Sequence, residues 1–210
     1  ALLARGEEFQ RVLDLDEEVQ KLKAQREALK EAESYTEELR FRMGKTFYEL
    51  GRPWEAFWVF WGAWRDFPKS EMADESLFAA FSLSGELDLY DRAVEMGNEY
   101  MKDFQEGDNY DELTLSLGQL HAKHRDYDAA LAVFKKALEV HPEHAYTDQV
   151  TFQIGYCLFQ KEEFDKALEV FTGFRAKSSD TLVREASDYW IGLTYMFKKD
   201  YKTARIEFGD

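Results

Sequence analysis

Residues 110–143 read YDELTLSLGQLHAKHRDYDAALAVFKKALEVHPE. Two small residues in this stretch, Gly118 and Ala130, stand twelve positions apart on either side of the polar segment AKHRD. Tyr127 comes three residues before the alanine and Phe134 four residues after it, which places both aromatic rings on the alanine's face of a helix. The stretch therefore predicts two antiparallel helices that approach closely at the small residues, with aromatic rings filling the remaining space.

The same four positions recur along the chain with a period of 37 residues. The alanines are Ala56, Ala93, Ala130, Ala167 and Ala204, and the residues twelve before them are Gly44, Phe81, Gly118, Gly155 and Gly192. The residues three before them are Pro53, Tyr90, Tyr127, Phe164 and Tyr201, and those four after them are Phe60, Gly97, Phe134, Phe171 and Phe208. This agreement predicts five helix pairs over residues 37–210, the last one truncated, with each second helix opening at the proline or aromatic position.

The second of these units is irregular. Phe81 stands where the other units have glycine, and Gly97 stands where they have an aromatic residue. We expect the two departures to compensate each other, with Phe81 filling space that Gly97 vacates.

Residues 110–143 resemble the tetratricopeptide repeat family. The matching positions are Leu117, Gly118, Tyr127, Ala130, Phe134, Ala137 and Pro142. The stretch departs from the family pattern at Thr114 and His121, where tryptophan and tyrosine are usual. The resemblance covers roughly residues 37–210 and implies an all-α, right-handed superhelix of about five helix pairs. It also implies a non-catalytic scaffold that binds a protein or peptide partner, in keeping with the many unrelated partners of such arrays.

The repeat length points to narrower groups within that family. The usual period is about 34 residues, and the extra residues here lie in FPKSEMADESLF, residues 67–78. Units of this length with a P-x-S-x-x-A pattern are similar to two bacterial groups, the lipoprotein subunit of the outer-membrane β-barrel assembly machinery and the Tol–Pal-associated coordinator of envelope constriction. This resemblance implies a place in the bacterial periplasm or at the outer membrane.

Composition excludes several classes of partner. The formal net charge is −15, so we expect no nucleic-acid binding, which needs clustered Lys and Arg, and we favour a basic or neutral partner. No run of about 18 apolar residues is present, so we expect no membrane span. The single cysteine, Cys157, excludes an intrachain disulfide. The helical pattern is still running at the last residues, ARIEFGD, so we expect the chain to be part of a longer protein.

Residues 1–36 do not fit the repeat. Their apolar residues Val12, Leu15, Val19, Leu22 and Leu29 follow heptad spacing and are surrounded by charges. We expect an amphipathic helix that packs on the first unit and caps the array, since a terminal repeat must hide a core face. A short coiled coil for self-association and a disordered segment remain the alternatives.

Residues 54–64, WEAFWVFWGAW, hold four of the five tryptophans. Trp54, Trp58 and Trp61, continued by Arg65, form a stripe roughly 120° around the helix from its core face, which we call the Trp flank. The other units hold mostly polar residues at these registers, so three exposed indoles here would make an interaction surface. We expect them to be covered by residues 1–36, by a second copy of the chain or by another protein.

Stacked first helices in such arrays line a groove that takes an extended or helical peptide. By register, the aromatic and apolar lining is predicted to include Phe41, Tyr48, Phe78, Phe152, Tyr156, Phe159, Tyr189 and Met196. The other interpretation of these side chains is that they pack helix against helix.

Catalytic or metal-binding patterns are weak. His121 falls on a core register, and His141 and His144 flank Pro142 at a helix end, where histidines often meet terminal carbonyl groups. No HExxH, paired CxxC or glycine-rich phosphate loop occurs, so we expect no cofactor, no metal and no enzymatic activity. Two further functions stay open: a self-assembling structural oligomer, and a regulatory domain of a larger protein.

Overall fold

The computed structural model describes residues 19–25, 28, 36–177 and 181–209. All regular secondary structure in these ranges is helical, and no described helix is both long and apolar enough to cross a bilayer. Residues 19–25 and 36–49 are helical. The helices that follow are α2 (Pro53–Asp66), α3 (Ala73–Glu86), α4 (Tyr90–Asp103), α5 (Tyr110–Lys123), α6 (Tyr127–Val140), α7 (Thr147–Gln160), α8 (Phe164–Lys177), α9 (Thr181–Phe197) and α10 (Tyr201–Glu207).

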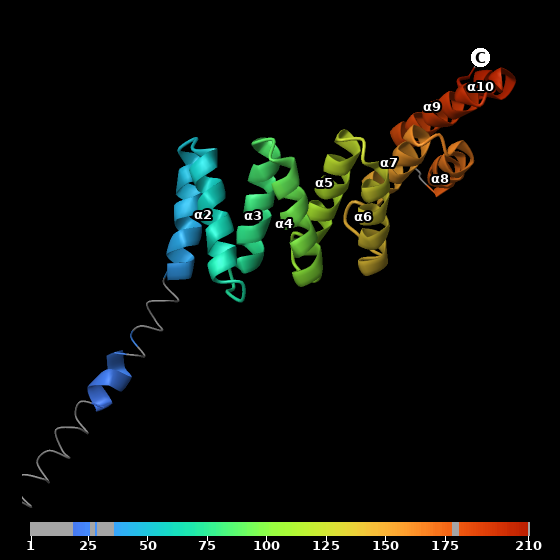
Figure 1. Ribbon diagram of the computed structural model, residues 1–210. Helices are drawn as coiled ribbons and strands as arrows, with labels where there is room; N and C mark the ends of the chain where they lie inside the picture. The colour runs from blue at the N-terminus through green and yellow to red at the C-terminus, as the bar shows by residue number, and fades with distance from the viewer. Residues whose placement is uncertain (1–18, 26–27, 29–35, 178–180, 210) are drawn as a thin grey trace, which may run out of the picture. The chain divides into compact units, whose positions relative to one another are not determined.

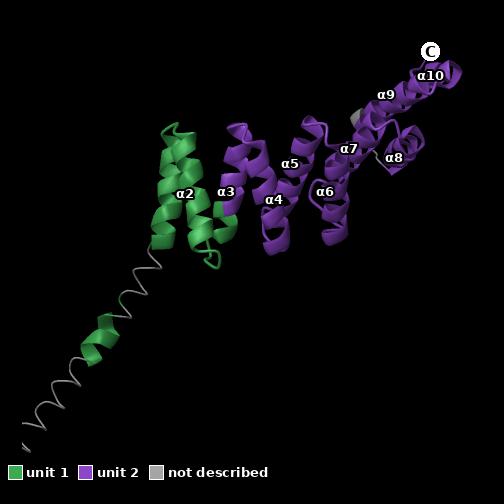
Figure 2. Cartoon of the chain, viewed as in Figure 1, with its two compact units in different colours: residues 1–76 green, residues 77–210 purple. Residues whose placement is uncertain are grey.

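The chain divides into two compact units, residues 1–76 and residues 77–210 (Figure 2). In the first unit, the helix at residues 36–49 packs against α2 through the edge-on rings of Phe41 and Phe60, whose centroids lie 5.5 Å apart. In the second unit, α5 pairs with α6, α7 with α8 and α9 with α10, and each pair packs on the next (Figure 1).

The predicted helix starts are confirmed. The second helices of the five pairs begin at Pro53, Tyr90, Tyr127, Phe164 and Tyr201. The periodic alanines are buried as well: Ala56, Ala93, Ala130 and Ala167 are fully inaccessible and Ala204 is 4% exposed. The two helices lie so close at this register that only a small side chain, the methyl group of alanine, fits between them.

The periodic glycines face the aromatic ring of their own unit. A Cβ atom added to Gly118 would lie only 2.2 Å from Cε1 of Phe134, too close for any real contact. The corresponding closest approaches are 2.7 Å for Gly44 and Phe60, 2.6 Å for Gly155 and Phe171, and 2.7 Å for Gly192 and Phe208. Each glycine thus leaves a hollow in the first helix, and the ring from the second helix occupies it.

In the irregular second unit, a side chain from the next unit lies over the glycine. A Cβ added to Gly97 would lie 2.8 Å from a methyl carbon of Leu117, so Leu117 of α5 occupies the space over this glycine. Phe81 is buried, with 5% of its surface exposed. The expected filling of that space by Phe81 itself stays a prediction.

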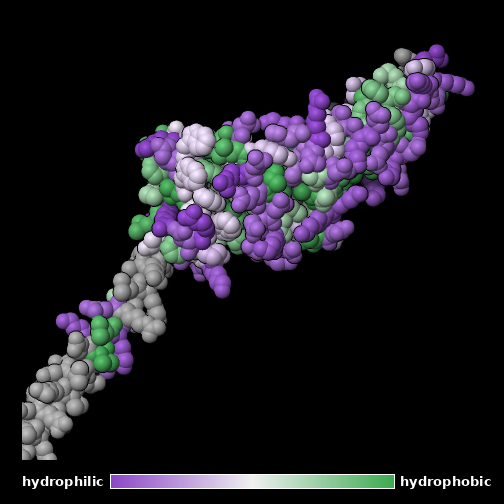
Figure 3. Space-filling view, viewed as in Figure 1, coloured by the Kyte–Doolittle hydropathy of each residue, from purple (hydrophilic) through white to green (hydrophobic). Residues whose placement is uncertain are grey.

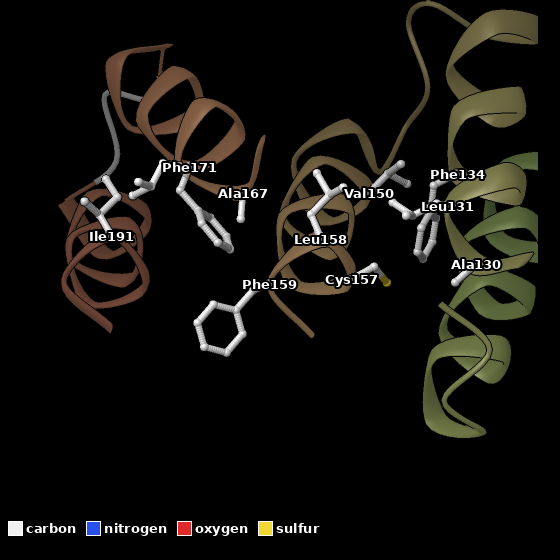
Figure 4. Packing of buried hydrophobic residues seen from close by; sticks show 11 residues of the cluster. Ala130, Leu131, Phe134, Val150, Cys157, Leu158, Phe159, Ala167, Phe171 and Ile191 are labelled. Atoms are coloured by element: carbon white, nitrogen blue, oxygen red, sulfur yellow. The ribbon is translucent and has the colours of Figure 1, made fainter. Parts of the chain in front are cut away.

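The core of residues 77–210 runs through successive helix pairs (Figure 4). Figure 4 shows Val150 and Cys157 of α7 on the side that faces Phe134 of α6. The full cluster comprises Ala130, Leu131, Phe134, Val150, Cys157, Leu158, Phe159, Ala167, Leu168, Phe171 and Ile191. Because α7 contributes to both sides of this cluster, it joins its own pair to the preceding one.

The turn inside each unit repeats one backbone conformation. Its central residue has a φ between 57° and 69°, in the left-handed region. The five residues are Gly51, Asp88, Arg125, Glu162 and Lys199, at the same 37-residue period. Only the first is glycine, the residue that adopts this conformation without strain.

The predictions for residues 1–36 fall mostly outside the described residues. Within the described helical segment 19–25, Val19 is 45% and Leu22 is 58% exposed. These two members of the predicted apolar seam are therefore not covered in this structure.

Candidate protein-interaction surfaces

The Trp flank is an exposed aromatic surface on α2. Trp54 is 49% and Trp58 is 52% exposed, whereas Trp61 is partly buried. Trp58 and Trp61 meet edge to face, with centroids 5.2 Å apart. The Arg65 guanidinium lies 4.9 Å from the centroid of the Trp61 ring, a cation–π contact. Trp58, Trp61 and Arg65 are therefore in contact with one another through the Trp61 ring. Trp54 is a further exposed indole on the same flank.

The opposite face of α2 explains why this flank stays outside. Ala56, Phe57, Phe60 and Ala63 fill the core side of the helix. Phe57 supports the flank from beneath, since its ring meets Trp58 edge to face at 5.2 Å and stacks with Trp61 at 6.5 Å. Trp58 and Trp61 are thus held by the buried ring of Phe57 and lose less freedom when a partner binds than unsupported side chains would.

Two of the predicted groove residues belong to the core. Phe41 and Phe159 are each 8% exposed, so neither ring offers an open surface. Phe41 packs on Phe60 and carries the Lys45 ammonium 4.9 Å above its ring. Phe78 is partly buried against Tyr100, with ring centroids 6.4 Å apart.

Trp190 of α9 contacts two more predicted groove residues, Phe152 and Tyr156, together with Phe159, and the sequence interpretation missed it. Its ring lies edge-on to Phe152 at 6.0 Å, to Tyr156 at 5.5 Å and to Phe159 at 5.4 Å. It also stacks on the core ring of Phe171 at 5.8 Å. The aromatic residues of α7 therefore pack helix against helix here. The sequence did mark Trp190 as unusual, since the other units have no aromatic residue at this register but Arg42, Ala79, Ser116 and Gln153.

Three predicted groove residues do present open surface. Tyr48 is 52%, Tyr189 54% and Met196 40% exposed. On the face seen in Figure 3, the surface of residues 77–210 is mostly hydrophilic, with small apolar patches. The other large exposed apolar side chains of α9, α10 and the residue after it are Phe197, Tyr201, Ile206 and Phe208.

The histidines are structural, and two of them have partners other than those expected. His141 and His144 do not bind terminal carbonyl groups with their rings. His141 Nδ1 pairs with Oδ1 of Asp111 at 2.7 Å, and His144 Nε2 lies 3.1 Å from Oγ1 of Thr114. The backbone N–H of Ala145 donates to the second oxygen of Asp111 at 2.7 Å. Asp111, at the start of α5, thus fastens the turn between α6 and α7.

Hydrogen-bond roles fix the proton on His144. The N–H of Tyr146 donates to His144 Nδ1, so the neutral ring carries its proton on Nε2 and donates to Thr114. The Thr114 hydroxyl in turn donates to the carbonyl of Tyr110. His121 is buried at 5% exposure, which confirms its core register, and it pairs through Nδ1 with the Tyr90 hydroxyl at 3.0 Å.

This unit of two antiparallel helices with a glycine–phenylalanine contact also matches a known family. Residues 112–144 match the tetratricopeptide repeat. No curated protein sequence matches the chain.

Solved structures of tetratricopeptide repeat solenoids share the fold. A MamA protein superimposes with a TM-score of 0.66 at 17% identity, covering 82% of this chain and 88% of that one. MamA from Desulfovibrio magneticus RS-1, from residue 41 to its end, gives 0.61 at 20% identity over 82% and 90%. YrrB, described as a tetratricopeptide repeat protein with an unusual peptide-binding site, gives 0.60 at 18% identity over 80% of each chain. The all-helical tetratricopeptide repeat fold is thereby established.

Two buried titrating groups in the matched repeat give it a dependence on pH. Burial lowers the pKa of His144 below the ordinary 6.5; the Asp111 carboxylate opposes this shift and His141 adds to it. Burial also lowers the pKa of His121. For Asp111, burial raises the pKa, but the hydrogen bonds from Ala145 and His141 outweigh it, so the net shift is downward from 3.8.

We expect the repeat array to lose stability as the pH falls below 6.5. Below pH 6.5 the histidines of the unfolded chain bind protons, whereas His144 and His121 of the folded chain remain neutral. The free energy of unfolding therefore falls with pH until the lower pKa values of the folded chain are reached. Denaturant midpoints at pH 7.5 and 5.5 measure the effect. Both pH values lie above the range in which Asp111 titrates. His144→Gln should reduce the difference between the two midpoints, because it removes one of the two buried imidazoles. An unchanged difference in His144→Gln would contradict the assignment.

The remaining reactive side chain is inert. Cys157 is fully buried, and burial raises the pKa of its thiol to about 11, so it stays protonated near neutral pH. Among the residues that the structure describes, no cluster of three or more His, Cys, Asp or Glu side chains could hold a metal ion.

Proposed function

We propose that this chain is a non-catalytic scaffold that binds another polypeptide through the Trp flank of α2. The observation that carries the proposal is the exposure of Trp54 and Trp58, each about half open to solvent, on a helix whose other face is core. Tryptophan is among the residues most enriched at binding hot spots. A tetratricopeptide repeat array supplies the rigid support that such a surface needs.

Comparison among the units supports a special role for this surface. The registers of Trp54, Trp58 and Trp61 hold Asp91, Glu95 and Asn98 in the second unit and Asp128, Ala132 and Lys135 in the third. The fold does not require tryptophan at these positions, because the same helix pair forms without it. A binding role accounts for the indoles where packing does not.

The open groove residues of each unit offer further contact surface. Tyr48 lies on the helix at 36–49, in the same unit as the Trp flank, while Tyr189 and Met196 lie on α9. The net charge of −15 favours a basic or neutral partner over an acidic one. The 37-residue period and the Pro68-x-Ser70-x-x-Ala73 pattern support a place in the bacterial envelope, which fractionation of cells expressing the full-length gene would test.

The binding experiment uses residues 1–210 against a displayed library of random 15-residue peptides. Selected peptides should lose affinity about 30-fold for a Trp54→Ala/Trp58→Ala variant, since two hot-spot residues contribute about 1 kcal/mol or more each. The matched control is Tyr201→Ala, which removes an aromatic side chain that is 65% exposed on α10. Peptides that bind the double variant as tightly as the wild type would exclude the Trp flank as their site.

Self-assembly is the competing function, and solution mass separates the two. A scaffold for another polypeptide should sediment as a monomer at micromolar concentration, with or without the two tryptophans. An oligomer that dissociates in Trp54→Ala/Trp58→Ala would show that the flank binds a second copy, and the proposal would fail.

A further inference from the structure

The turn between one repeat and the next has the same backbone three times. The N–H of Ser70 donates to the carbonyl of Phe67 at 3.1 Å, and the N–H of Ala73 to the carbonyl of Ser70 at 3.1 Å. The same two bonds join Phe104, Gly107 and Tyr110, and again His141, His144 and Thr147, at distances of 3.0 to 3.1 Å. The side chains on these turns can therefore be compared position by position.

In the third of these turns, side chains close the space beside the backbone. His144 is 3% exposed and His141 is bound to Asp111, which lies 30 residues earlier in the chain. The acidic residue recurs at that register throughout, as Glu37, Asp74, Asp111, Asp148 and Glu185. Two imidazoles thus fill the turn and meet the carboxylate that the repeat provides.

In the first of these turns, the imidazoles are missing and the carboxylate remains. The counterparts of Asp111, His141 and His144 are Glu37, Phe67 and Ser70. A pocket of about 760 Å³ opens there, within the range of peptide and small-ligand sites. Its lining consists of Glu37, Glu38, Phe67, Pro68, Lys69, Ser70, Glu71 and Met72. We call this space the turn pocket.

Three carboxylates and one ammonium group, that of Lys69, line the turn pocket, so its net charge favours a cation. Glu37 and Glu71 have no hydrogen-bond or ion-pair partner among the described residues, and Glu38 already pairs with Arg42 at 2.5 Å. Phe67 and Met72 supply the apolar wall. Carboxylates and an aromatic ring that line one pocket suit a guanidinium group, which stacks on aromatic faces and donates to carboxylates in its own plane.

The chain itself provides an example of this recognition on the same ring. The Arg40 guanidinium lies 5.1 Å from the centroid of Phe67 and binds the Asp66 carboxylate at 2.5 Å. We propose that the turn pocket binds an arginine side chain of a partner polypeptide, in the position that His141 and His144 occupy in the third turn. The pocket is larger than one side chain, so residues flanking the arginine enter it as well. The site shares no residue with the Trp flank.

The test follows the Met72 methyl resonance in methionine-labelled protein of residues 1–210. The probe is the peptide acetyl-Ala-Leu-Arg-Leu-Ala-amide, compared with the same peptide carrying citrulline, which is nearly isosteric but uncharged. We expect a saturable shift of Met72, with at least tenfold tighter binding of the arginine peptide, while the buried Met96 and Met101 stay unmoved. Equal binding of the two peptides, or no shift at Met72, would overturn the proposal.

Three variants sharpen the outcome. Glu37→Gln/Glu71→Gln should weaken arginine-peptide binding at least tenfold, whereas Glu49→Gln, an exposed acid in the same unit, should not. Phe67→His/Ser70→His transplants the side chains of the closed turn and should block the peptide, with unchanged helix content as the check on folding. Binding that survives both pocket variants would place the peptide elsewhere.

This experiment is independent of the proposed function. Trp54→Ala/Trp58→Ala should leave the arginine peptide's affinity unchanged, so a failure at the turn pocket and a failure at the Trp flank give different results.

Discussion

Gly118→Ala is expected to lower the free energy of unfolding by about 2–3 kcal/mol, the cost typical of an overpacked core. The added methyl group would lie 2.2 Å from Cε1 and 2.5 Å from Cζ of Phe134. That ring is fully buried, so it cannot move aside without displacing its neighbours. The change opposes the intrinsic preference of a helix for alanine over glycine, about 1 kcal/mol, and urea midpoints followed by circular dichroism would measure the net effect.

Gly173→Ala is the matched control. Gly173 lies inside α8, and apart from its chain neighbours and the backbone of its own helix nothing stands within 4 Å of the position that a Cβ would take. Here the helix preference acts alone, and stability should rise by about 0.5–1 kcal/mol. Opposite signs for the two substitutions would demonstrate the glycine–phenylalanine contact, and Phe134→Leu should partly rescue Gly118→Ala. Equal signs would refute it.

Trp190→Ala is expected to cost about 3 kcal/mol, in the range measured when large aromatic side chains are truncated in cores. The substitution removes ring contacts to Phe152, Tyr156, Phe159 and Phe171 at once. Because these contacts join α7 and α8 to α9, the loss should appear as earlier melting of the C-terminal units, detectable by hydrogen exchange of their amides.

Trp58→Ala removes the same side chain from the Trp flank and serves as the comparison. With 52% of its surface exposed, Trp58 should contribute less than about 1 kcal/mol to folding. A large cost at Trp58 would mean that the flank is part of the core, and a small cost at Trp190 would mean that the α7 aromatic residues remain free to line a groove.

The repeat itself could be predicted because its physical cause is local. A glycine and a phenylalanine such as Gly118 and Phe134 are only 16 residues apart, in the two helices of one hairpin, so each complementary pair leaves its mark in one short stretch. The starts of the second helices followed from the same registers. These features depend on contacts within a unit, which a period in the sequence records directly.

The candidate surfaces were harder to predict, since exposure depends on the neighbouring unit. The register placed Phe159 on the groove side, but the rings of Phe164, Trp190 and Phe197 surround it. The pairing of His141 with Asp111 was missed because histidine occupies this register in only one turn, and a single occurrence shows no period. Trp54 and Trp58 were predicted as an unusual surface because their departure from the other units is large.

Four turns of residues 77–210 hold a charged residue in the strained left-handed backbone region. Their charges alternate along the array, from Asp88 to Arg125, Glu162 and Lys199. A chain of similar units can misfold when a unit skips its neighbour in sequence and packs on the unit after that. That error would place like charges at neighbouring turns, Asp88 with Glu162 or Arg125 with Lys199, whereas the native order places opposite charges there. The native order of the units is therefore the one in which the charge of this turn residue changes sign from each unit to the next.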